Sequence, residues 1–507
     1  MLTRLKVSGF KNLVDADVRF GPFTCIAGPN GVGKSNLFDA IRFLSATASR
    51  TLMEAALSVR SQKASTADVR DLFHRVGDYT ADRVFFEVEM IAPPEAVDDL
   101  GQQAKATANL LRYTLELRLR DNAEVAASRG PLEIIKEELV HIHLKQAGKH
   151  LQFDHTPSTW RKTALHVKRR AAPFISTEEE EQGRVIKLHE DGGGRGRGIS
   201  NPATQPRTVL SVANAAECPP ALCAKREMES WQLLQFEPSS MREPDGMNAP
   251  IHLASNGAHL ASTLYHLAKT VDPRTPKADE EAVYCRAVNR LKELIDDVAA
   301  IAVDRDEKRE LLTLKVAARD GAAYPARSLS DGTLRFLALA VIEMDTQAQG
   351  VVCLEEPENG IHPERIPAMI RLLQDIATDP DEPVDETNPL RQVIVNTHSP
   401  GVVLEVPEES LLVVEIREDI RSGQRIGKAV FSSLPDTWRQ KADPAARPVS
   451  KGKLLAYLNP ASSPDEQPTS LYTTGEPPRP PPRVRRRRVA DRDDLHQYLP
   501  GLRQVAE

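Results

Sequence analysis

The stretch Gly28-Pro-Asn-Gly-Val-Gly-Lys-Ser-Asn36 holds three glycines, a lysine and a serine within nine residues. The residues before it, FTCIA at 23–27, form an apolar run that predicts a short buried strand. After it, Leu37, Ile41 and Leu44 recur at helical spacing and predict a helix over residues 35–46. A strand, a glycine-rich loop and a helix in this order indicate an α/β domain organised around the loop.

The loop matches the spacing G-x4-G-K-[ST], in which each residue type has a physical reason. Glycines let backbone N–H groups close around phosphate oxygens, and the positive N-terminus of the following helix points at the same anions. Lys34 would reach the β- and γ-phosphates, and Ser35 would supply a hydroxyl to Mg²⁺. A chance match in a chain of this length is on the order of one in a hundred, so an ordinary glycine turn is a weak alternative. The candidate residues for binding ATP are Asn30, Gly31, Gly33, Lys34, Ser35 and Asn36.

Two neighbouring carboxylates follow an apolar run further along the chain. Residues 351–357 read VVCLEEP, which predicts a buried strand that ends in Glu355 and Glu356. In open α/β sheets, ligands bind at the carboxyl ends of the strands. Glu355 is placed to hold Mg²⁺ directly or through water, and Glu356 to orient and deprotonate an attacking water. Many strands end in acids, so this signal is weak alone and strong beside the phosphate loop.

Two shorter motifs each allow a structural and a functional interpretation. Residues 329–333, LSDGT, open an apolar helix, where Ser330 and Gly332 would form a second anion site from free N–H groups. Taken alone, a plain helix cap is the favoured interpretation of this motif. His398 follows the apolar run QVIVN at 392–396 and could touch a γ-phosphate, although a structural histidine is favoured in isolation.

Strand-like and helix-like patterns alternate over much of the chain, which predicts a sheet with helical crossovers. Between about 150 and 220, a basic run, an acidic run and a glycine-rich patch predict an insertion with mobile loops. A solvated surface is the favoured interpretation of these charges, and contact with DNA is the less favoured one. The tail, proline-rich and then basic at 477–488, reads equally as a free linker or as a nucleic-acid or partner contact. The remaining expected strands are 83–91, 111–119, 311–317 and 392–396, after an N-terminal hairpin, and the expected helices are 255–268, 280–299, 334–344 and 364–377. The periodicity of 132–144 allows a strand or a helix, and the strand is favoured.

Composition excludes several classes of protein. The chain has 507 residues, of which 40% are hydrophobic, enough for two to four domains or one large domain with insertions. No long apolar window and no secretory leader are visible, so neither a membrane span nor secretion is expected. Five scattered cysteines favour a reducing cytoplasm over disulfides or a zinc site. The net charge of −6 is mild, so any nucleic-acid contact needs a local patch.

The order of these motifs, phosphate loop, LSDG, acidic strand and histidine, resembles that of ABC-type ATPases. GPNGVGKSN is similar to the phosphate loop of the structural-maintenance-of-chromosomes (SMC) and RecF proteins, and the later motifs resemble the OLD-like branch of bacterial ABC-related ATPases. The resemblance covers about 1–145 and 230–415. The stretches that carry it are LKVSGFKNL (5–13), WQLLQFEPSSMREP (231–244), SLSDGTLRFLAL (328–339), CLEEPENGIHP (353–363) and VNTHSP (395–400).

This resemblance implies an ABC-type, RecF/SMC-like P-loop ATPase head of the α/β class, with a mixed sheet and an N-terminal β-hairpin. An irregular insertion would stand in place of long coiled coils. The expected organisation is a first part of the head at 1–145, a partly flexible insertion at 146–230, a second part of the head at 231–436, and a Pro/Arg-rich tail at 437–507.

The resemblance also implies that two heads pair face to face, with each nucleotide held between the phosphate loop of one head and the LSDG turn of the other. Ser330 and Gly332 would contact the γ-phosphate across the dimer. Asn359 and Gly360 match the D-loop, which in the family lies between the paired heads, and His398 matches the switch histidine. The candidate catalytic residues are Lys34, Glu356 and His398, and the candidate Mg²⁺ ligands are Ser35 and Glu355.

The chain departs from the family pattern in two places. Glu355 stands where ABC proteins usually carry an aspartate, and the glutamine of the Q-loop is not identified. The run LLVVE, ending at Glu415, superficially resembles the opening of a Toprim nuclease, but no glycine follows it and no later D-x-D sits after an apolar strand. A built-in nuclease is therefore not expected. The candidates for the Q-loop glutamine are Gln62, Gln102, Gln103 and Gln152.

The sequence thus predicts an enzyme that binds and hydrolyses MgATP as a homodimer or higher oligomer. By family analogy, ATP-dependent pairing of heads would gate a separately encoded effector, a nuclease or toxin, or would act on DNA, in anti-phage defence or DNA repair. An alternative is a scaffold that ATP stabilises and that turns over little. A component of a membrane transporter is disfavoured by the long insertion and the SMC-like GKSN.

Overall fold

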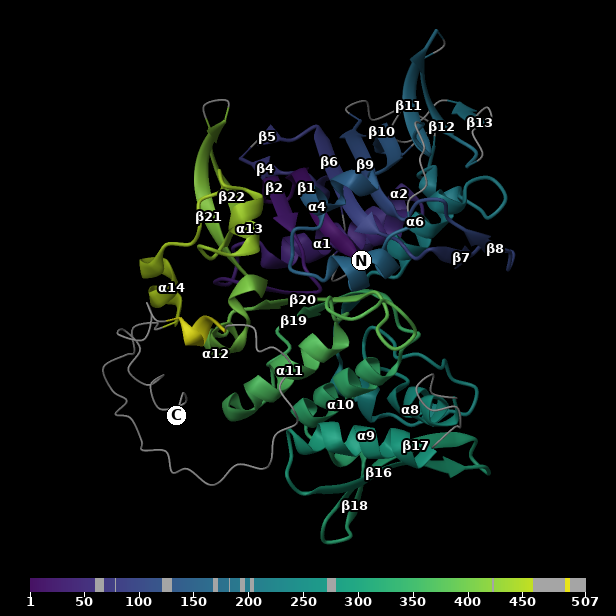
Figure 1. Cartoon of the computed structure of the whole chain (residues 1–507), viewed down its shortest axis with the longest axis vertical. Helices are drawn as coiled ribbons and strands as arrows, with labels where there is room; N and C mark the ends of the chain where they lie inside the picture. The colour runs from purple at the N-terminus through teal and green to yellow at the C-terminus, as the bar shows by residue number, and fades with distance from the viewer. Residues whose placement is uncertain are drawn as a thin grey trace.

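The computed structural model (Figure 1) shows an upper lobe with a large sheet and a lower lobe of helices with a small sheet, and a second large sheet runs between them. We call these the upper lobe, the lower lobe and the central sheet. The structure describes residues 1–59, 68–77, 79–120, 130–166, 172–181, 183–191, 197–200, 205–270, 280–421, 424–458 and 488–492.

The central sheet has six strands in the order β14-β19-β20-β3-β21-β22. All neighbours are parallel except β21 and β22. Every residue of β3 and β20 is buried, because helices or strands cover both faces, and this explains the apolar stretches within them. The parallel order confirms the predicted crossovers and brings several strand ends to one edge. The strands are β3 (Phe23–Ala27), β14 (Gln232–Leu234), β19 (Gly350–Glu355), β20 (Arg391–Thr397), β21 (Leu411–Arg421) and β22 (Gln424–Ser433).

The upper lobe is built on an eight-stranded antiparallel sheet in the order β13-β12-β11-β10-β9-β6-β1-β2. Helix α1 (Lys34–Thr47) packs beneath it: the ring of Phe43 lies 6.3 Å from that of Phe10 and 5.5 Å from that of Phe86, between centroids. The same core reaches Ile26 and Val351 of the central sheet. The strands are β1 (Leu2–Phe10), β2 (Leu13–Arg19), β6 (Arg83–Ile91), β9 (Leu110–Leu119), β10 (Leu132–His141), β11 (Ile175–Glu180), β12 (Gly183–Leu188) and β13 (Arg197–Ser200).

The lower lobe covers the other face of the central sheet with α10 and α11, whose buried side chains join those of β19 and β20 in one core. The helix expected over 280–299 is wrong at its end: it stops at Lys292, and Val298 begins β16. The carbonyl of Leu291 closes the last turn, after which the chain pairs with β17. The elements are α8 (Leu260–Lys269), α9 (Glu280–Lys292), α10 (Asp331–Met344), α11 (Ile366–Ile376), β15 (Asp245–Gly246), β16 (Val298–Asp306), β17 (Leu311–Ala318) and β18 (Ala323–Pro325).

The segment 146–230 contains more regular structure than its composition indicates. Strands β11 to β13 extend the upper sheet, and α6 (Pro219–Glu229) packs into the upper core with Leu222 and Cys223 fully buried. The acidic run lies largely within β11, whereas the basic residues 168–170 and most of the glycine-rich patch lie outside the described residues.

The start of the tail folds back onto the central sheet. Helices α13 (Trp438–Ala442) and α14 (Lys451–Leu458) follow β22, and α14 packs on α12 (Pro400–Glu405). Further on, Arg488 forms an ion pair with Glu405 at 2.9 Å. The proline- and arginine-rich residues 477–487 lie outside the described residues.

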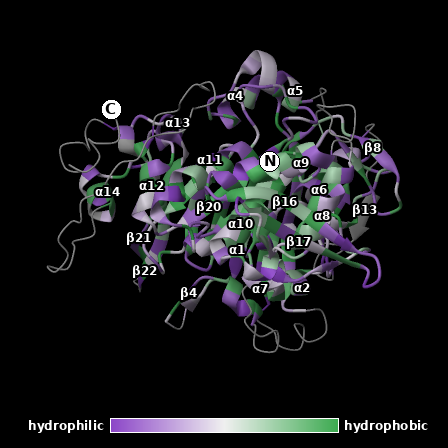
Figure 2. Cartoon of the chain, turned by 90° about the horizontal axis from the view of Figure 1, so that it is seen from below, coloured by the Kyte–Doolittle hydropathy of each residue, from purple (hydrophilic) through white to green (hydrophobic). Residues whose placement is uncertain are grey.

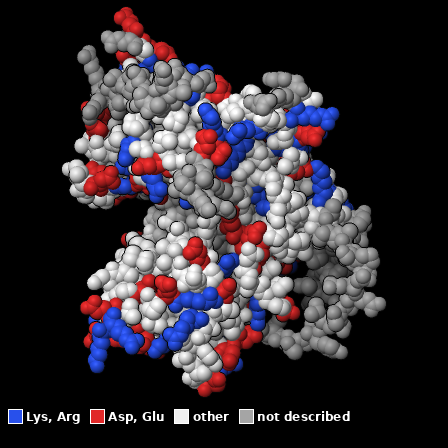
Figure 3. Space-filling model, turned by 180° about the vertical axis from the view of Figure 1, so that it is seen from behind, with Lys and Arg blue, Asp and Glu red and all other residues white. Residues whose placement is uncertain are grey.

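Colouring by hydropathy shows apolar residues gathered around α1, α10 and β20 and polar residues toward the rim (Figure 2). Charges of both signs are interspersed over the face drawn in Figure 3, which a deep notch divides. Within the described part of the chain, no helix is both long and apolar enough to cross a membrane. The other short elements are α2 (Leu52–Ser58), β4 (Arg75–Val76), β5 (Tyr79–Thr80), β7 (Glu95–Val97), β8 (Gln103–Lys105), α4 (Ala147–His150), α5 (Lys162–Ala164) and α7 (Pro238–Arg242).

Candidate nucleotide-binding site

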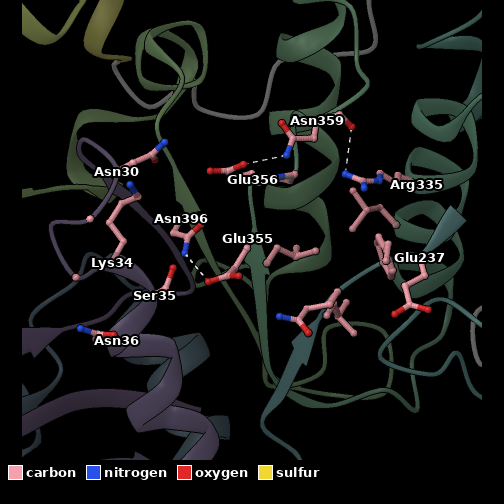
Figure 4. A pocket seen from close by; sticks show the side chains of 18 residues that line it. Asn30, Lys34, Ser35, Asn36, Glu237, Arg335, Glu355, Glu356, Asn359 and Asn396 are labelled. Carbon is pink, nitrogen blue, oxygen red and sulfur yellow. Dashed lines mark hydrogen bonds between the residues drawn. The ribbon is translucent and has the colours of Figure 1, made fainter. Parts of the chain in front are cut away.

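The ends of four central strands meet at one edge, where a cavity of about 560 Å³ opens between the phosphate loop and the lower lobe (Figure 4). The loop after β3 forms one wall, and the residues after β14 and β19 form the opposite one. The structure therefore brings together the loop and both predicted acids. The polar lining comprises Asn30, Gly31, Gly33, Lys34, Ser35, Asn36, Gln235, Glu237, Arg335, Glu355, Glu356, Asn359 and Asn396.

The phosphate loop is held in shape from within and from behind. Lys34 Nζ donates hydrogen bonds to the carbonyls of Gly28, at 2.6 Å, and Pro29, at 2.9 Å. Gly33 has φ of 104°, and a Cβ there would lie 2.3 Å from the side chain of Asn12, so only glycine fits. Asn12 sits between β1 and β2 and donates to the carbonyl of Val32 at 3.1 Å.

The electrostatics around Lys34 combine opposing effects. Burial lowers the pKa of its ammonium group, while the nearby carboxylates of Glu356, Glu355 and Glu358 favour the charged form. The net direction is downward. A triphosphate placed in the loop would add negative charge beside Lys34 and would therefore favour its protonated form.

Glu356 lies immediately after β19 with φ of 47°, a backbone region that non-glycine residues rarely adopt. Both of its carboxylate oxygens have partners: Asn359 Nδ2 donates to one at 2.9 Å, and His398 Nδ1 lies 2.7 Å from the other. Partial burial alone would raise its pKa, but the hydrogen bonds from Asn359 and His398 outweigh burial and lower it. Glu356 is therefore ionised near neutral pH.

Glu355 faces the loop across the cavity, toward Ser35 (Figure 4). Asn396 Nδ2, on the neighbouring strand β20, donates to its carboxylate at 3.3 Å. An aliphatic hydroxyl and a carboxylate are the hard oxygen donors that Mg²⁺ takes alongside phosphate oxygens and water. The residues present thus fit a magnesium-bound nucleotide, and Ser35 and Glu355 are the residues that would hold the ion.

The LSDG turn lies outside the cavity lining. Ser330 is exposed at the start of α10, and its hydroxyl caps the helix by accepting a hydrogen bond from the Thr333 N–H at 3.2 Å. Gly332 is buried against the backbone of Gly360 in the same chain. The structural interpretation as a helix cap therefore holds within one chain, while the hydroxyl side of the turn remains at the surface.

Replacing Gly332 with alanine should loosen this packing, because a Cβ at this position would lie 2.0 Å from the carbonyl oxygen of Gly360. Overpacking of this kind costs about 1–3 kcal/mol. We expect urea unfolding to show a loss in that range. Gly246→Ala is the matched control, since a Cβ there meets open space. Equal stability of the two variants would contradict the contact.

Sequence reasoning missed five residues of this site, one of which is Glu237 of the cavity lining. Gln235 directly follows β14 and lines the cavity, whereas none of Gln102, Gln103 and Gln152 does, and Gln62 lies outside the described residues. The sequence signal that could have identified Gln235 is its position directly after the run WQLL, within the stretch 231–244 that resembles the OLD-like ATPases. The other missed residues are Asn12, Arg335 and Asn396, whose places depend on tertiary contacts.

Comparisons with known proteins show similarity to ATPase domains. A family model described as "AAA domain, putative AbiEii toxin, Type IV TA system" matches residues 228–405, and one described as "AAA domain" matches residues 4–124. The DNA replication and repair protein RecF of Magnetococcus marinus is 37% identical over 113 residues, which are 22% of this chain and 28% of that protein. The OLD nuclease of Thermus scotoductus is 51% identical over 41 residues, 8% of each chain.

The aligned parts therefore span less than a third of these curated relatives. Among solved structures, an SMC head bound to the C-winged helix domain of ScpA covers 85% of this chain and 98% of that chain, at 13% identity and a TM-score of 0.41. The residues that line the cavity all fall within the two AAA matches. The chain thus carries AAA-domain ATPase sequence in two segments, residues 4–124 and 228–405, and over shorter stretches it is similar to RecF and OLD proteins.

Proposed function

We propose that this chain binds MgATP in the cavity and hydrolyses it, and that two copies pair through their nucleotide faces. The observation that carries the proposal is the meeting of Lys34, Glu355 and Glu356 in one cavity, with His398 in contact with Glu356. A lysine from a glycine-rich loop binds phosphate, and an ionised carboxylate can take a proton from water.

In this proposal Glu356 is the general base and Lys34 binds the phosphates. Glu356 receives the proton of the attacking water on a carboxylate oxygen, and each of its oxygens keeps a free lone pair beside the partner it already has, Asn359 or His398. Ser35 and Glu355 would hold Mg²⁺, which supplies positive charge next to the phosphate oxygens. Gln235 lines the same cavity, between the phosphate loop and the lower lobe, where its amide could form hydrogen bonds to the bound nucleotide or to water.

Pairing of two heads is supported by the exposed LSDG turn. Ser330 stands at the surface at the N-terminal end of a 14-residue helix, where free N–H groups and the helix dipole favour an anion. It lies outside its own cavity, so a nucleotide held by a second copy is the partner that it suits.

The biological role rests on what the relatives are called. One family model names a putative toxin of a type IV toxin–antitoxin system, and the matched proteins include a DNA replication and repair protein and a nuclease. We propose that ATP-dependent pairing gates a separately encoded effector, or a step on DNA, in defence or repair. The alternative is an ATP-stabilised scaffold with little turnover.

The test measures mass and turnover together. Light scattering in ATP and Mg²⁺ is expected to give twice the chain mass of 56.0 kDa, and EDTA or ADP should return the single-chain mass. Phosphate release should require Mg²⁺. Pairing without phosphate release would favour the scaffold, and no response of either readout to ATP would contradict both functions.

A further inference from the structure

A buried carboxyl lies directly behind the Glu356–His398 pair and takes no part in the chemistry described above. Glu358 is only 8% exposed, although it follows Glu356 by two residues at the cavity edge. Thr397 Oγ1 donates a hydrogen bond to Glu358 Oε1, and the same hydroxyl accepts one from the Ser399 N–H at 2.9 Å. The Thr397 side chain is completely buried.

This bond ties together the two turns that carry the reacting pair. Glu358 belongs to the turn after β19, which begins with Glu356, and Thr397 is the last residue of β20, immediately before His398. The Glu356 N–H also donates to the carbonyl of Asn396 at 2.9 Å, so the turns start in register. After this backbone hydrogen bond, the Glu358–Thr397 side-chain bond links the two turns on their buried side.

The buried Glu358–Thr397 pair lowers the stability of the fold, because one oxygen of Glu358 lacks a partner in the part of the chain that the structure describes. The second oxygen of Glu358, Oε2, is buried and has no hydrogen-bond partner among the described residues. Burial accordingly raises the pKa of Glu358. Apolar residues of similar volume at these two positions would fill the same space and would leave no buried oxygen without a hydrogen bond. The pair is better explained by the geometry that it imposes than by the stability that it adds.

We propose that Glu358 and Thr397 are positioning residues for hydrolysis: their hydrogen bond fixes the turn before His398 so that its Nδ1 stays within reach of Glu356. The proposal rests on the proposed ATPase function and deepens it. Neither residue lines the cavity, so neither would touch a nucleotide bound there. Their loss should therefore act on turnover and not on ATP binding, and should act through His398.

Thr397→Val removes the hydroxyl at nearly constant volume, and Thr397→Ser keeps it. We expect Thr397→Val to lower kcat about 10- to 100-fold with KM for ATP changed less than about threefold, as displacement of a reacting group by about 1 Å does. Thr397→Ser should restore most of kcat. The matched control is Thr208→Val: its hydroxyl is equally buried in the upper lobe, donating to the Thr47 carbonyl at 2.9 Å and accepting from the Ser211 N–H.

A double-mutant comparison separates positioning from general damage. In a His398→Ala background, Thr397→Val should cost no further kcat, because the group that it positions is gone. An additive loss, or a loss equal to that of Thr208→Val, would overturn the proposal. Should Thr397→Val not fold, Glu358→Leu breaks the same bond from its other end, while Glu358→Gln keeps an acceptor for the hydroxyl and should retain more turnover.

The proposed function and the positioning role fail differently. A wild-type chain without Mg²⁺-dependent phosphate release would overturn the proposed function and the positioning role with it. A wild-type chain that hydrolyses ATP while Thr397→Val and Glu358→Leu match it in kcat would overturn the positioning role alone.

Discussion

Replacement of Lys34 with alanine is expected to abolish ATP binding at micromolar nucleotide and, with it, ATP-dependent pairing. The ammonium group lies inside the phosphate loop and donates to two loop carbonyls, which it must exchange for phosphate oxygens. Charge-assisted hydrogen bonds are each worth about 1.5–3 kcal/mol, so loss of two weakens binding by roughly 10²- to 10⁴-fold. Titration with a fluorescent ATP analogue measures the effect directly.

The control for this variant is Lys6→Ala, on the outer face of the upper sheet, where Lys6 Nζ pairs with Glu87 at 3.1 Å. A partly exposed pair of this kind contributes about 1 kcal/mol or less, so binding should be unchanged. Lys34→Ala with wild-type affinity would show that the nucleotide, if bound at all, lies elsewhere.

The phosphate loop was predictable because all of its determinants are local. The strand, the glycines and the helix that shape it lie within about 25 consecutive residues, and each residue type is dictated by backbone geometry or by phosphate chemistry. The acids at 355–356 followed from a different rule, that ligands gather at the carboxyl ends of parallel strands. Both predictions needed only the pattern of the chain.

The supporting residues were not predictable in the same way. Asn12 belongs to a turn between the first two strands and reaches the loop only because β2 and the central sheet pack together. Asn396 meets Glu355 because β19 and β20 are neighbours in register, although 41 residues separate the two side chains. Such contacts are set by sheet order, which single-chain periodicity does not give.

The expected end of the helix at 280–299 failed for a related reason. Residues 293–299 continue an apolar spacing that suits either a helix or a strand, and the pairing of β16 with β17 decides between them. Biased composition misled in the other direction at 146–230: three strands and a core helix are present there, and the acidic run lies largely within β11.

Replacement of Glu356 with glutamine should stop turnover while leaving ATP bound. The amide has nearly the same size and can still accept a hydrogen bond from Asn359 Nδ2, so the turn at φ of 47° should keep its shape. It has no basic oxygen for the proton of water, and loss of a general base lowers kcat by about 10²- to 10⁴-fold. ATP-bound pairs should therefore accumulate and persist in light scattering and in retained nucleotide after gel filtration.

Glu364→Gln is the control, because its side chain is largely exposed and the nitrogen of its ion-pair partner, His362 Nδ1, lies 3.8 Å away. It should hydrolyse ATP like the wild type, and its paired heads should separate at the same rate.

Comparison with Lys34→Ala in a biological assay then separates the two proposed functions. If Glu356→Gln keeps biological activity that Lys34→Ala loses, bound ATP is sufficient and the scaffold is favoured. If both lose it, the cycle of pairing and release is what the partner requires. Hydrolysis by Glu356→Gln at the wild-type rate would instead contradict the assignment of the base, and would leave Glu355 as the carboxylate next to the phosphate loop to test in the same way.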